Sequence, residues 1–159
     1  MSPVDSRAAL VHAECVRDWA AVKAHLARAR GADPSRGDAE AALVALSLDH
    51  AYQAFETILR RLERSVGLPE RAGSNWHMAL LADAAMALTG VRPALFPPES
   101  LADWEAVLRF RHFLRHAYVL TLDAEKLRDN AARLERAVQA TDAWLDAVLT
   151  AILASGTSA

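Results

Sequence analysis

The chain has 159 residues, of which 53% are apolar, and a formal net charge of −2. This length is typical of one domain, and the apolar fraction excludes a chain that is disordered throughout. The small negative charge excludes a protein that coats nucleic acid with a basic surface over its whole length, so a phosphate-binding function would need a local cluster of cations.

Five helices are predicted, because Ala and Leu dominate the sequence and the apolar residues recur at helical spacing. The predicted helices span residues 2–31, 38–67, 74–90, 100–118 and 123–154. The residues expected to cap their N-termini are Ser2, Asp38, Ser74, Ser100 and Asp123. The connections are short, which favours antiparallel neighbours. We therefore expect an all-α, up-and-down antiparallel helical bundle that forms a single domain over residues 1–159.

One cysteine, Cys15, excludes an internal disulfide and fits a cytoplasmic protein. The N-terminus, MSPVDSRAAL, has no basic region followed by an apolar run and is not expected to be a signal peptide. No stretch approaches the ~18 consecutive apolar residues of a membrane span. We expect a cytoplasmic location and no membrane partner.

The stretch RFRHFLRHAY, residues 109–118, concentrates cations in a fourth helix that is otherwise apolar. At ~100° per residue, one stripe of this helix is apolar and is predicted to face the core. Its members are Phe110, Phe113, Leu114 and Ala117. The other side is then a cationic arc about 160° wide. The arc holds Arg111, His112, Arg115 and His116, with Arg109 at its edge.

The cationic arc is expected to face an anion, because like charges four residues apart on a helix cost a few tenths of a kcal/mol if nothing neutralises them. Three arginines at the end of the second helix offer an extension of the same surface: Arg60, Arg61 and Arg64. Arg60 and Arg64, like Arg109 and Arg115, are candidates for binding RNA phosphates.

Arginine combined with histidine suits cleavage of an RNA phosphodiester. An imidazole can remove the proton of the 2′-hydroxyl or protonate the leaving oxygen, and a guanidinium can bind the phosphate. No metal or other cofactor is required, because the 2′-hydroxyl is an internal nucleophile. One histidine with one arginine supplies too few groups. Either two copies of the chain meet across a two-fold axis, or the two histidines of one chain share the proton transfers.

The same stretch matches the pattern R-x4-H-x-Y through Arg111, His116 and Tyr118, and resembles the signature of HepT-like ribonuclease toxins in the HEPN superfamily. Further segments agree in order and spacing, and the similarity covers residues 43–138. These segments are GSNWHMALL (73–81), VRPALF (91–96) and LDAEKL (122–127).

The resemblance implies a homodimeric helical bundle that cleaves RNA without a metal, in a shared cleft at the dimer interface lined by the Arg and His of each subunit. In this cleft Arg111 would bind phosphate and His116 would be the acid/base group. It also implies a minimal nucleotidyltransferase (MNT-type) antitoxin that blocks the cleft by attaching a nucleotide to Tyr118. His112 follows the motif arginine, where the family commonly has Asn or another polar residue. Whether His112 or His116 is the main catalytic imidazole is left open.

Two further interpretations concern residues outside the motif. Trp76 is expected to be a packing anchor and His77 a capping or surface group, although both would also suit an RNA-binding cleft. The other tryptophans are expected in the core or a dimer interface: Trp19, Trp104 and Trp144.

The alternative to a nuclease is a non-catalytic helical subunit that uses the cationic arc to bind a nucleotidyltransferase.

Overall fold

The computed structural model describes residues 3–116 and 121–156, and these form an all-α fold. The helices are α1 (Pro3–Gly31), α2 (Asp38–Ser65), α3 (Trp76–Ala84), α4 (Leu101–His116) and α5 (Ala124–Gly156). Two short 3-10 helices, η1 (Pro34–Arg36) and η2 (Pro98–Ser100), precede α2 and α4. The predicted all-α bundle of five helices is confirmed, and no strand occurs within these two ranges.

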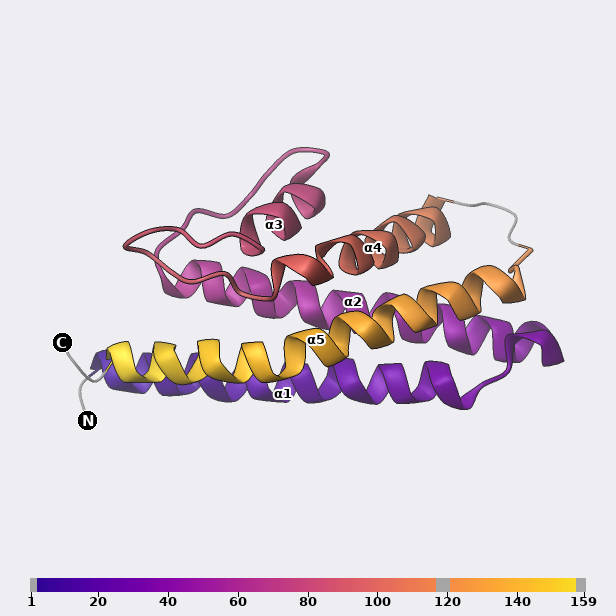
Figure 1. The fold of residues 1–159 in the computed structure, drawn as a ribbon, viewed down its shortest axis with the longest axis horizontal. Coiled ribbons are helices and arrows are strands. Elements are labelled where there is room, and N and C mark those ends of the chain that lie inside the picture. Colours follow the sequence, from indigo (N-terminus) through magenta and orange to yellow (C-terminus); the bar gives the residue numbers. More distant parts are fainter. Residues whose placement is uncertain (1–2, 117–120, 157–159) are drawn as a thin grey trace.

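The three longest helices, α1, α2 and α5, lie side by side, and α3 and α4 cover the remaining side of α2 (Figure 1). In the view of Figure 1, α1 and α4 run from left to right and α2 and α5 from right to left, so that the start of α1 and the end of α5 lie at the same end of the bundle. Helix α4 packs on both α2 and α5, and α3 packs on α4 and α2. The candidate functional residues therefore belong to a layer of α2, α3 and α4.

An aromatic cluster on the inward face of α2 forms the centre of the core. The ring of Phe55, which is fully buried, stacks on that of Trp104 with centroids 3.7 Å apart. Phe96 meets the Phe55 ring edge-on at 5.6 Å, and Trp19 of α1 lies 6.2 Å from it. The prediction that Trp19 and Trp104 are core residues is confirmed. Aromatic pairs in these geometries add stability beyond their buried area.

Trp144 differs from the other tryptophans of the predicted core. It is 39% exposed, and its indole N–H donates to the backbone carbonyl of Ala94 at 2.9 Å. Trp144 therefore lies at the surface, where it joins α5 to the connection before α4.

One predicted cap is confirmed and three are wrong. The carboxylate of Asp123 accepts hydrogen bonds from the backbone N–H groups of Glu125 and Lys126, at 2.8 and 3.2 Å, as an N-cap should. Asp38 is already inside the first turn of α2, because Gly37 takes the cap position.

The other two wrong predictions concern Ser74 and Ser100. Helix α3 begins at Trp76, with Asn75 and not Ser74 before it. The Ser100 hydroxyl donates to the carbonyl of Pro97 at 2.8 Å within η2 and does not cap α4. Ser2 lies outside the described residues.

The connection after α3 is fixed by buried charge. The buried Arg92 guanidinium donates to the backbone carbonyls of Met86 at 2.8 Å and Asp83 at 3.0 Å. It also lies 3.4 Å from Glu63 at the end of α2. Arg71 bridges the carboxylates of Glu63 and Asp83, at 2.9 and 2.6 Å. This network ends α3 earlier than predicted, at Ala84 instead of near Gly90, and anchors α3 against α2.

Helix α5 is long and apolar enough to cross a membrane by length and composition alone. Its inner face is nevertheless part of the core, through Leu145, Val148 and Leu149. Within the same helix Asp142 accepts a hydrogen bond from the indole N–H of Trp19 at 2.6 Å. The apolar composition of α5 thus serves its packing on α1.

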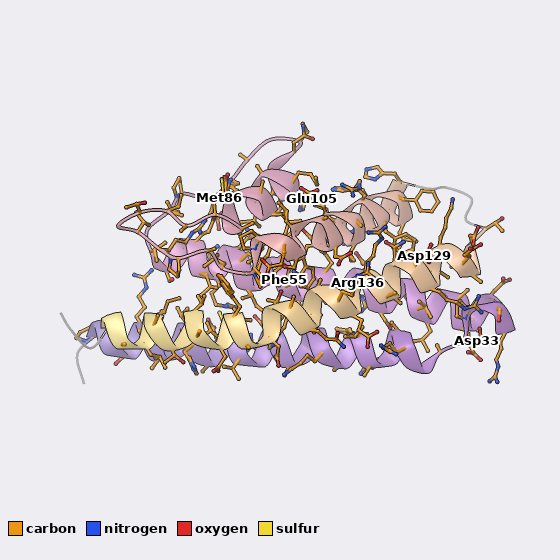
Figure 2. The ribbon with its side chains drawn as sticks, viewed as in Figure 1. Asp33, Phe55, Met86, Glu105, Asp129 and Arg136 are labelled. Atoms are coloured by element: carbon orange, nitrogen blue, oxygen red, sulfur yellow. The ribbon has the colours of Figure 1, made fainter. Side chains whose placement is uncertain are left out.

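Replacing Phe55 by Ala is expected to lower the free energy of unfolding by about 3–5 kcal/mol, because it removes a fully buried ring from the aromatic cluster. The control is Met86→Ala, since Met86 is 54% exposed and should change stability by less than about 0.5 kcal/mol. Figure 2 shows Phe55 between the helices and Met86 on the connection after α3. Urea unfolding of both variants at one protein concentration measures the difference, and equal losses would contradict this core assignment.

Candidate functional site

Arg111 faces the inside of the bundle. Trp104, Val107 and Leu108 are fully buried, and Arg111 follows them at helical spacing with 6% exposure. Phe113, predicted for the core, is 52% exposed. Phe113 was predicted to face the core and is exposed, and Arg111 was predicted to face away from the core and is buried. Both predictions are wrong because the core-facing side of α4 is rotated from the side that the phenylalanines indicated.

Three side chains of α2 surround the Arg111 guanidinium. Its Nε donates to Oδ1 of Asp49 at 2.7 Å, and its Nη1 lies 3.9 Å from Oε1 of Glu56. The guanidinium also lies over the ring of Tyr52, 5.6 Å from its centroid. Positions 49, 52 and 56 share one face of α2. The buried positive charge is thus compensated by two carboxylates.

Tyr52 is fully buried beside this pair. Its pKa is raised well above the ordinary value, first by burial and then by the negative charge of Glu56. The hydroxyl therefore stays protonated beside the carboxylate of Glu56.

Helix α3 brings a third histidine to the motif histidines of α4. Nδ1 of His77 lies 2.5 Å from Oε2 of Glu56. Its ring is 5.4 Å from that of His112, edge to face, and 3.6 Å from the stacked ring of Trp76. The expectation that His77 is a capping or surface group is wrong, whereas Trp76 packs against the core as predicted.

His112 is half-buried, and its pKa is lowered. Burial is the largest cause, followed by the positive charges of His77, Arg111 and His116, while Glu56 acts in the opposite direction. Since the ordinary pKa of histidine is about 6.5, the imidazole of His112 is neutral at pH 7. A neutral imidazole can accept a proton.

His116 is exposed, on a different side of α4 from Arg111. Its Nδ1 lies 2.8 Å from the backbone carbonyl of His112, and its ring centroid is 6.2 Å from that of His112. Helix α4 is unbroken from Arg111 to His116, so these two side chains diverge by about 140°. Tyr118, the predicted modification site, lies outside the described residues.

The exposed arginines of α4 are paired with carboxylates. Arg109 is 60% exposed and lies 3.6 Å from Glu105. Arg115 is 53% exposed and lies 3.7 Å from Asp49. The carboxylate of Asp49 thus serves both Arg111 and Arg115, which the sequence of α4 alone does not reveal.

The arginines of α2 separate into two groups. Arg60 lies over the Trp76 ring at 5.3 Å, and both Arg60 and Arg64 pair with Glu70. Arg61 instead binds carboxylates of α1, so it does not extend the surface as the sequence suggested. The rings of His77, His112 and His116 form a histidine cluster. Arg60 is connected to this cluster through Trp76, whose ring stacks on His77.

Sequence reasoning missed three residues of this site, Asp49, Tyr52 and Glu56, and for His77 it favoured a capping or surface role over a place in the cleft. Their common signal is weak. The α2 residues interrupt an apolar helix face with polar groups at helical spacing, and His77 lies in a segment that the family resemblance already marked.

The described residues offer acid/base and phosphate-binding groups. Across residues 3–116 and 121–156, no group of three or more His, Cys, Asp or Glu side chains is arranged to hold a metal ion. The cluster of guanidinium, imidazole and carboxylate groups is suited to proton transfer beside an anion.

Comparison with known proteins supports the resemblance seen in the sequence. A family model described as HepT-like protein, HepT-like_2, matches residues 43–152, which is more than half of the chain. No curated protein and no solved structure matches the chain. The chain therefore belongs to the HepT-like family, and this membership implies a HEPN-type toxin.

Proposed function

We propose that the protein is the ribonuclease toxin of a toxin–antitoxin pair and that it cleaves RNA without a metal ion. Family membership supports the reaction class. The observation that carries the proposal is the position of the half-buried His112, which directly follows Arg111 on α4 and lies 5.4 Å from the ring of His77. Burial, followed by the neighbouring positive charges, lowers the pKa of this imidazole and keeps it neutral. A neutral base beside a fixed cation is what attack of a 2′-hydroxyl on a phosphodiester requires.

Each motif residue then has a role. His112 accepts the 2′-hydroxyl proton. Arg111, held by Asp49 through Nε, stabilises the phosphate charge with its Nη groups, which form no hydrogen bond to another described residue. His116 is exposed at the end of α4 and contacts a neighbouring phosphate of the RNA.

A second copy of the chain is the partner that the surface near the site favours. An apolar groove between α2 and α4 is lined by Ala42, Ala45, Leu46, Leu114 and Leu122, with Asp49 and Arg115 at its polar part. Leu46 and Phe113 beside it are 55% and 52% exposed. Asp49 and Arg115 line the groove, and Asp49 also binds Arg111, so a homodimer formed here would place the Arg111 residues of both protomers near one interface.

The proposed partner that regulates this toxin is a nucleotidyltransferase antitoxin. In the sequence Tyr118 follows His116 by two positions. A nucleotide attached to Tyr118 would add bulk and negative charge beside cations that otherwise bind RNA.

The alternative is a non-catalytic helical subunit that binds a nucleotidyltransferase. The observation that favours it is the burial of Arg111, whose side chain is 7% exposed and whose charge Asp49 and Glu56 compensate. On this alternative the ion pair only fixes α4 to α2.

Expression of the wild-type chain without an antitoxin is expected to arrest bacterial growth and degrade RNA, and Arg111→Ala, His112→Gln and His116→Ala are expected to abolish both effects. The control is Arg17→Ala, because Arg17 is 68% exposed on α1 and outside the site. Since loss of Arg111 leaves Asp49 and Glu56 unpaired, Arg111→Lys is tested beside it with helicity measured by circular dichroism. A harmless wild-type chain that leaves RNA intact would contradict the nuclease and favour the binding subunit.

Incubation with the cognate nucleotidyltransferase and ATP is expected to add nucleotide mass to the peptide that contains Tyr118, and to lower the ribonuclease activity in proportion. Mass spectrometry of the digested protein measures the modification, and Tyr118→Phe is the control that should remain unmodified. An unmodified Tyr118 in the wild type would contradict this mode of regulation.

The wild-type chain is expected to sediment as a dimer, with twice the mass of 17.3 kDa. Leu46→Glu places a charge in the apolar groove and should shift the protein to the monomer and reduce the activity. Met86→Glu is the matched control, because Met86 is equally exposed, at 54%, but lies on the connection after α3. Analytical ultracentrifugation distinguishes these results, and a Leu46→Glu variant that stays dimeric would place the interface elsewhere.

A further inference from the structure

The contact between His77 and Glu56 joins the histidine cluster to a residue outside the motif of α4. Nδ1 of His77 lies 2.5 Å from Oε2 of Glu56, and the two side chains are 20% and 8% exposed. Three elements make this contact possible: α2 supplies Glu56, α3 supplies His77, and the Arg92 network holds α3 in place.

The Glu56 carboxylate determines what the His77 ring can do. An ionised carboxylate only accepts hydrogen bonds, so the proton on Nδ1 stays with the imidazole and points at Glu56. Nε2 is then the nitrogen available to a substrate, and it has no hydrogen bond to another described residue. The same carboxylate compensates the positive charge that the ring carries when Nε2 is also protonated.

His112, whose ring is 5.4 Å away, lies in the opposite environment. It is surrounded mainly by positive charge, from Arg111, His77 and His116, and burial further lowers its pKa. Two adjacent imidazoles with opposite electrostatic surroundings are suited to opposite halves of a proton transfer.

We propose that His77 is the general acid of the cleavage reaction, that Glu56 is its positioning residue, and that His112 is the base. This inference rests on the proposed ribonuclease function and deepens it. It gives each protomer its own acid and base, which the motif alone did not provide.

The reaction balances without another reactant. His112 takes the proton of the 2′-hydroxyl, and the 2′-oxygen forms a bond to phosphorus. The bond from phosphorus to the 5′-oxygen breaks, and His77 gives its Nε2 proton to that oxygen. The products are a 2′,3′-cyclic phosphate and a free 5′-hydroxyl, and the two histidines recover their protonation states by exchange with water.

The test compares two RNA oligonucleotides of one sequence, one with the natural 5′-oxygen at the cleaved linkage and one with sulfur in its place. A thiolate leaves without a proton, so a missing general acid no longer matters. His77→Gln is expected to cleave the natural linkage about 10²–10⁴-fold more slowly than the wild type, and the sulfur linkage at nearly the wild-type rate. Glu56→Gln should show a smaller loss with the same rescue.

The controls separate this inference from the proposed function. His112→Gln should lose activity on both linkages, because a better leaving group does not replace the base. His50→Gln, a substitution of an exposed histidine on α2, should match the wild type on both. A wild-type chain that cleaves neither linkage would overturn the proposed function and this inference together. An active wild type with His77→Gln unchanged, or slowed equally on both linkages as loss of packing would do, would overturn only the role of His77.

Discussion

The ion pair between Arg111 and Asp49 is the interaction on which the arrangement of α2 and α4 depends. Arg111 occupies the last buried position of the stripe that starts at Trp104, and a buried guanidinium without a partner would cost several kcal/mol. Asp49 and Glu56 remove that cost only if α2 and α4 keep their present rotation. An apolar pair in the same place would often be as stable or more so, so stability alone does not explain a charge here. The proposed phosphate-binding role of the guanidinium would account for it.

The compensating carboxylates also connect the rest of the site. Glu56 lies 3.9 Å from Arg111 and 2.5 Å from His77, so one side chain relates the cation of α4 to the imidazole of α3. Helix α3 has only nine residues, too few to be stable by itself. Its position depends on the buried Arg92 and on Trp76, which packs against the core. Arg92 and Trp76 therefore fix the position of His77 on α3.

Much of the fold follows from local sequence, and most of the site does not. The five helices, the Asp123 cap and the burial of Trp104 were predictable because periodicity and capping act within a few residues. The rotation of α4 was not, since Phe110 and Phe113 form an apolar stripe as regular as the true one. What decides between them is the partner of Arg111, and that partner is 62 positions away in the sequence. The contact of His77 with Glu56 has the same character, because it depends on how two helices pack.

The divergence of Arg111 and His116 on an unbroken helix decides how the motif can work. Two groups about 140° apart on one helix cannot both contact a single phosphate from the same side. The phosphate must therefore lie near one of them, and proton-transferring groups from another element or another subunit must complete the site. His112 lies about 100° from Arg111 and about 40° from His116 on this helix, and His77 of α3 contacts its ring. Under the proposed function, these two histidines complete the site within one protomer. The carboxylate of Asp49 binds both Arg111 and Arg115, and it also borders the apolar groove. A second copy bound in that groove would therefore act on the same carboxylate that orients Arg111, so that dimer formation and the alignment of the phosphate-binding group would depend on one residue.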